Sequence, residues 1–73
     1  MSWNRYALDS VPDNFEDRLK VMDLTFKSEK DLGRRDYVKS TFPAFLRGNG
    51  ILLHEKTIQI LNENGFTCNK VEE

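Results

Sequence analysis

The sequence predicts an all-α fold, a compact bundle of four or five short helices that contains a helix-turn-helix. Three observations support this prediction. Apolar residues recur at helical spacing between residues 15 and 26, Ser/Thr-led segments have the form of helix starts, and glycines stand where helices would end. A chain of 73 residues forms one domain, residues 1–73, near the lower size limit for folding alone.

The first predicted helix follows an N-terminal arm, residues 1–10, in which Trp3 is an apolar anchor. Pro12 suits the first helical turn because its missing N–H has no partner there in any case. A stripe of apolar residues then recurs at helical spacing, and we expect this stripe to face the core. The stripe consists of Phe15, Leu19, Met22 and Phe26.

A helix-turn-helix is predicted at residues 28–48. Ser28 and Asp31 have the form of a capping box, which predicts that a second, short helix begins at Ser28 and runs to Arg35. Gly33 falls inside that helix, where it costs about 1 kcal/mol relative to Ala and therefore needs a structural reason. The segment RDYV, residues 35–38, then breaks the pattern and forms the turn.

The recognition helix is predicted at about residues 40–47. It begins at Ser40 or Thr41, so that Pro43 lies in its first turn, and Gly48 ends it. Its aromatic residues, Phe42 and Phe45, are expected in the core. A last helix is predicted from about residue 53 to 64 with Gly65 at its end. The C-terminal tail that follows, residues 67–73, is expected to be either a stub of strand or a loose segment.

Three stretches carry a family resemblance: DRLKVMDLTFKSEKDLGRR (residues 17–35), KSTFPAFLRGNG (39–50) and LLHEKTIQILNENGF (52–66). In this order they resemble helices of the lambda-repressor-like, Cro-type helix-turn-helix domains of phage repressors and antitoxins. The resemblance covers roughly residues 15–67 and implies double-stranded DNA as the partner. The chain departs from that pattern at Glu29, where the family usually has a phosphate-contacting Gln, and at Pro43 and Ala44 in the recognition helix.

The charge distribution also indicates the region around the recognition helix as the DNA-binding surface. The formal net charge is −1, but residues 27–47 hold six basic and three acidic side chains, whereas both flanking segments are acidic. Basic residues around a recognition helix would contact phosphates, and the first residues of that helix would read base edges. The predicted DNA-binding residues are Lys27, Lys30, Arg34, Arg35, Lys39, Ser40, Thr41, Arg47 and Asn49.

No enzymatic activity, metal or cofactor is predicted. The single histidine, His54, has no companion ligands for a zinc site and is expected at the exposed start of a helix. The single cysteine, Cys68, excludes an intrachain disulfide and lacks a neighbouring base. No apolar run is long enough to span a membrane, and the N-terminus lacks a signal-peptide core, so the expected location is cytoplasmic.

The leading functional prediction is a small DNA-binding transcriptional regulator, a phage-type repressor that acts as a homodimer on a two-fold site. The alternative is a non-enzymatic protein-interaction module, an antirepressor or other small phage-type regulator, whose helix-turn-helix-like scaffold no longer binds DNA. Glu29 and the acidic net charge favour the alternative. A continuous basic face would favour DNA, and an exposed patch with Trp3, Phe42 or Phe45 would favour a protein partner.

Overall fold

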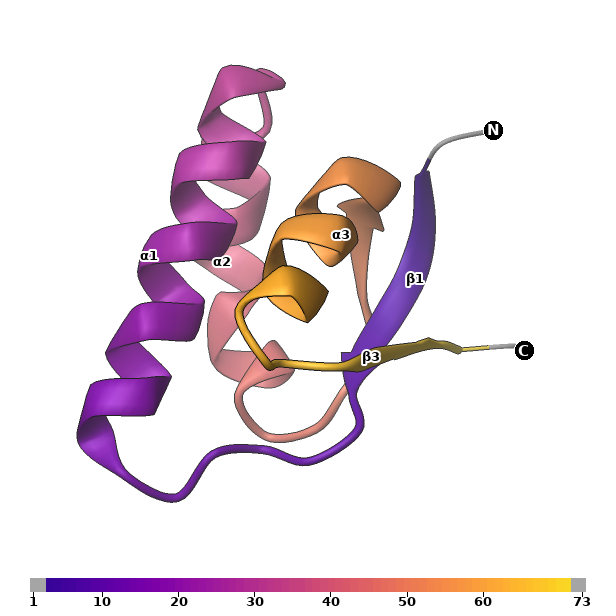
Figure 1. Cartoon of the computed structure of the whole chain (residues 1–73). Coiled ribbons are helices and arrows are strands. Elements are labelled where there is room, and N and C mark those ends of the chain that lie inside the picture. The colour runs from indigo at the N-terminus through magenta and orange to yellow at the C-terminus, as the bar shows by residue number, and fades with distance from the viewer. Residues whose placement is uncertain (1–2, 72–73) are drawn as a thin grey trace.

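The computed structural model describes residues 3–71 and combines three helices with a three-stranded antiparallel sheet (Figure 1). The predicted all-α bundle is therefore wrong. The elements in chain order are β1 (Trp3–Leu8), α1 (Phe15–Asp31), α2 (Arg35–Phe45), β2 (Ile51–His54), α3 (Glu55–Glu63) and β3 (Cys68–Lys70).

The sheet has the strand order β2-β1-β3, so the N-terminal segment forms its central strand. Tyr6 of β1 lies opposite Ile51 of β2 on one side and Lys70 of β3 on the other. Residues 3–8 form a strand rather than the predicted N-terminal arm, and the strand alternative for the C-terminal segment is confirmed at residues 68–70. Residues 1–2 and 72–73 lie outside the described part. The helices lie on one side of this sheet (Figure 1).

Helix α1 continues through Ser28 without a break, so the short helix predicted to start there does not exist. Asn14 caps the start of α1 by accepting the Asp17 N–H at 2.8 Å. Gly33, with φ +77°, follows the end of α1, where Arg34 N–H donates to the Glu29 carbonyl at 2.8 Å. This Schellman-type ending needs a left-handed residue, which explains the glycine. The turn of the helical hairpin is therefore at residues 32–34, not at 35–38.

Helix α2 begins at Arg35, five residues before the predicted start of the recognition helix. Ser40 and Thr41 consequently lie in its middle, where both hydroxyl groups donate to the Tyr37 carbonyl, at 2.9 and 2.8 Å. Pro43 lies inside the helix rather than in its first turn, and the helix ends two residues later at Phe45. The predicted helix-turn-helix at residues 28–48 is thus replaced by two longer helices and a different turn.

Two further expectations are confirmed. Phe42 and Phe45 are core residues, 4% and 0% exposed, and Phe42 meets Phe26 of α1 edge to face with ring centroids 5.3 Å apart. His54 begins α3 as its N-cap, and its Nδ1 accepts the Lys56 N–H at 3.0 Å, but the side chain is half-buried rather than exposed as expected.

A buried carboxylate joins α1 to the start of α3. Glu29 is 0% exposed, and its Oε2 accepts the His54 N–H at 3.2 Å and the Thr57 hydroxyl at 2.5 Å. Because the Thr57 hydroxyl proton is used here, the Ser28 hydroxyl is the donor in its 2.7 Å contact with Thr57 Oγ1. The carboxylate also lies at the N-terminus of α3, where the helix dipole favours negative charge.

We predict that Glu29→Ala destabilises the protein by about 2–4 kcal/mol, since it leaves the His54 N–H and the Thr57 hydroxyl without their acceptor. Thr25→Val is the matched control on the same buried face, because the Thr25 hydroxyl has no hydrogen-bond partner among the described residues. We expect the control to change stability by less than about 1 kcal/mol. Urea unfolding followed by circular dichroism measures both, and equal losses would contradict the role of Glu29.

Candidate interaction surfaces

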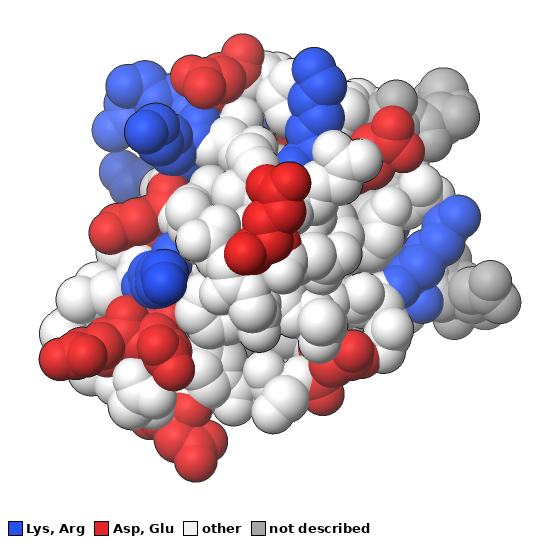
Figure 2. Space-filling view, in the orientation of Figure 1, with Lys and Arg blue, Asp and Glu red and all other residues white. Residues whose placement is uncertain are grey.

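Five of the nine predicted DNA-binding residues gather at one end of the molecule, around the α1–α2 turn. Lys27 and Lys30 lie in the last turns of α1, Arg34 and Arg35 lie at the start of α2, and Lys39 follows one turn later. In Figure 2 basic side chains gather over the end of the hairpin where α1 meets α2. We call these five residues the basic end.

The other four predicted residues do not join the basic end. Arg47 and Asn49 follow the C-terminus of α2, at the opposite end of that helix. Ser40 and Thr41 lie in the middle of α2, and their hydroxyl protons are directed to the Tyr37 carbonyl. The structure therefore contains a charged end that could contact phosphates, but not the predicted base-reading helix start.

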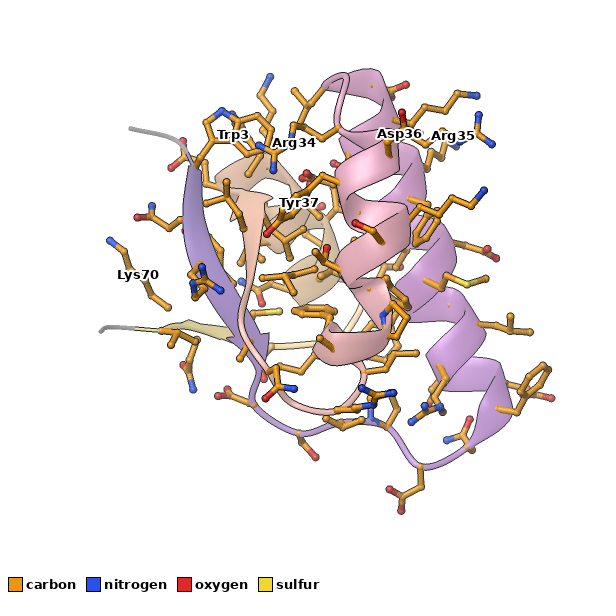
Figure 3. All side chains as sticks on the ribbon, turned by 180° about the vertical axis from the view of Figure 1, so that it is seen from behind. Trp3, Arg34, Arg35, Asp36, Tyr37 and Lys70 are labelled. Atoms are coloured by element: carbon orange, nitrogen blue, oxygen red, sulfur yellow. The ribbon has the colours of Figure 1, made fainter. Side chains whose placement is uncertain are left out.

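Arg34 is held between two aromatic rings. Its guanidinium carbon lies 4.5 Å from the ring centroid of Trp3 and 4.5 Å from that of Tyr37. Figure 3 shows these three side chains together, whereas Arg35 extends away from them. Such cation–π stacking restrains the arginine and joins the first residue of β1 to the helical hairpin.

The same aromatic group closes the free edge of β2. The Tyr37 hydroxyl accepts the Leu52 N–H at 3.0 Å, and two residues further along, the His54 N–H donates to Glu29. The Trp3 ring also meets the His54 ring edge to face, with centroids 4.7 Å apart. Side chains of the hairpin therefore occupy donors that an edge strand would otherwise offer to another strand.

The apolar stripe of α1 does not form the core face that the sequence predicted. Phe15 is 73% exposed and Leu19 is 38% exposed, while Met22 and Phe26 are half-buried against the core. The fully or nearly buried residues of α1 are instead mostly polar: Val21, Thr25, Ser28 and Glu29. Two large apolar side chains one helical turn apart are thus left on the surface.

The sequence contained a signal for this arrangement. Thr25 and Ser28 are spaced for one face of α1 together with Val21, so a second, more polar face competed with the stripe. Choosing the face with more apolar residues gave the stripe, which is not the buried face of α1. The buried face is fixed by the hydrogen bonds of Ser28 and Glu29 with Thr57, which lies nearly thirty positions further along the chain.

The remaining chemistry of the described residues is limited. Burial, followed by the nearby Asp9 carboxylate, raises the pKa of the Cys68 thiol to about 11, so this cysteine is not an activated nucleophile. Residues 3–71 contain no cluster of three or more side chains able to hold a metal ion, and they enclose no pocket. Among the helices of this region, none is long and apolar enough to cross a membrane.

Comparisons of the chain with models of protein families, with curated proteins and with solved structures found no match. The resemblance to lambda-repressor-like domains thus stays a prediction.

We predict that Arg34→Ala shifts the fluorescence emission of Trp3, the single tryptophan, to longer wavelength, because the indole loses the side chain stacked on it. Arg35→Ala removes the same charge from the neighbouring exposed position and should leave the emission unchanged. Steady-state emission spectra of the folded proteins test this. The stacking would be disproved by indistinguishable spectra for wild type and Arg34→Ala.

Proposed function

We propose that this chain is a non-enzymatic protein-interaction module whose contact surface is the outer side of α1. The observation that carries the proposal is the exposure of Phe15 and Leu19 on a helix that buries a polar face. Apolar side chains that cover no core are stabilised when a partner removes them from water. We place the interaction in the cytoplasm, in keeping with a single cysteine that has no disulfide partner in the chain.

The spacing of the stripe supports a helical or otherwise elongated partner. Its members follow one another by four, three and four residues, the spacing of a coiled-coil seam. Phe15 and Leu19 would supply the exposed part of the seam, and half-buried Met22 would extend it toward the middle of α1. Aromatic and Met side chains are enriched at the centres of protein interfaces.

A photoreactive phenylalanine analogue placed at position 15 in cells that express the chain tests this surface. We expect irradiation to yield a cross-linked protein, because the partner covers Phe15 within bond-forming distance. The same analogue at the exposed Gln59 of α3 is the control and should yield none. If position 15 cross-links no better than position 59, the outer side of α1 is not the contact surface.

DNA binding is a second candidate, and the basic end is the observation that favours it. Five basic side chains converge on one end of the hairpin. Glu29, the acidic departure from the family pattern, is 0% exposed and so does not face a DNA backbone. Such a surface would hold the phosphate backbone of double-stranded DNA without reading its sequence. A repressor function would then also need contacts to the DNA bases from residues outside the basic end.

We predict for this second candidate that binding to duplex DNA weakens with salt with a log–log slope of about −4.5, the value for five phosphate contacts. Lys30→Ala should flatten the slope by about 1, because one contact is lost. Arg47→Ala, at the opposite end of α2, is the matched control and should leave the slope unchanged. No binding near 50 mM salt, where electrostatic attraction is strong, would remove this candidate.

A further inference from the structure

We infer that the partner of the outer side of α1 is a second copy of this chain, paired antiparallel along α1 about a two-fold axis. This inference rests on the proposed function and names the occupant of the same surface. It is carried by the charge pattern of α1. Figure 2 shows acidic side chains gathered over the beginning of α1 and basic ones over its end.

The charges beside the apolar stripe occupy one face of the helix. Glu16, Lys20, Asp23, Lys27 and Lys30 follow one another at alternating spacings of four and three residues, so they share a face next to Leu19. All five are exposed. A partner seated on Leu19 would therefore meet these charges along one side of the contact.

This charge pattern is complementary to itself when the helix is reversed. Opposite charges stand at equal distances on either side of the midpoint between Val21 and Met22. The pairs are Glu16 with Lys27, Lys20 with Asp23, and Asp13, just before the N-cap of α1, with Lys30. In a two-fold dimer each pair occurs twice, since every contact from one copy is repeated by the other.

The apolar stripe has nearly the same midpoint. The centre of Phe15, Leu19, Met22 and Phe26 lies one residue before the centre of the charge pairs, a shift of about 1.5 Å along the helix. One antiparallel pairing therefore brings Leu19 near Met22 of the second copy and places opposite charges side by side. A parallel pairing would instead place like charges together at both ends, which is unfavourable.

The paired charges are also available. Within residues 3–71, none of Glu16, Lys20, Asp23, Lys27 and Lys30 forms an ion pair in its own chain. Two 17-residue helices meet over at most about 25 Å, and a contact of this size falls near or below the roughly 1,200 Å² of specific stable interfaces. The dimer is therefore weak and depends on concentration.

Sedimentation of the purified full chain from about 1 µM to about 1 mM tests the inference. The weight-average mass should rise from 8.6 kDa toward twice that value. Leu19→Asp, at a partly exposed position, should keep the chain monomeric throughout. Glu16→Lys should weaken the dimer about 10-fold by placing two lysines together at both symmetric sites.

A charge exchange within one chain identifies the pairing. Adding Lys27→Glu to Glu16→Lys restores opposite charges in the antiparallel dimer and should return the association to near its original strength. Glu63→Lys, which makes the same change on the exposed surface of α3, is the control and should have no effect. Circular dichroism of every variant confirms that the fold is retained.

The inference is overturned if the chain stays monomeric at all concentrations. It is also overturned if the chain dimerises but Leu19→Asp and the charge exchange leave the strength of association unchanged. The cross-linking at position 15 separates this failure from that of the proposed function. A monomer that cross-links to a different protein rejects the second copy but keeps the interaction surface. A monomer that cross-links to nothing rejects both.

Discussion

The hydrogen bonds of the buried Glu29 carboxylate are the constraint on which the arrangement of the other elements depends. One oxygen of this side chain, on the last turns of α1, holds the last N–H of β2 and the Thr57 hydroxyl in the first turn of α3. Burying a polar group without hydrogen-bond partners costs free energy, so this oxygen and the two donors that it accepts from are held together. Helix, strand and helix are thereby fixed at one point, next to the turn of the hairpin.

That constraint also sets the rotation of α1. Glu29, Ser28 and Thr25 are directed inward. The apolar stripe lies on the adjacent face of α1 and therefore cannot face the core along its whole length. Its C-terminal part packs against α2 through Phe26 and Phe42, whereas Phe15 and Leu19 remain on the surface. The exposure of Phe15 and Leu19 is thus a direct consequence of burying a polar face.

The two ends of α1 have different roles in this arrangement. Next to its C-terminal end, one residue of the basic end already has a structural contact. Arg34 is stacked between Trp3 and Tyr37 and helps to hold β1 against the hairpin. At its N-terminal end the acidic residues flank exposed apolar side chains. Opposite charge at the two ends of α1 favours pairing with an antiparallel copy. In such a dimer the two basic ends lie at opposite ends of the contact, away from one another.

The sequence by itself determined the local features. It located the last helix with His54 at its start and Gly65 at its end, and the core positions of Phe42 and Phe45, because capping and helical spacing act over a few residues. It placed the end of α2 at Gly48, whereas that helix already ends at Phe45. Only the tertiary structure decided that residues 3–8 form a central strand, that α1 continues past Ser28, and which face of α1 is buried. These depend on contacts such as Tyr6 with Ile51 and Glu29 with Thr57, between residues far apart in the chain, and no local spacing encodes them. Five of the nine predicted site residues came together because the hairpin turn fell at residues 32–34 rather than at 35–38, a placement that also depends on tertiary contacts.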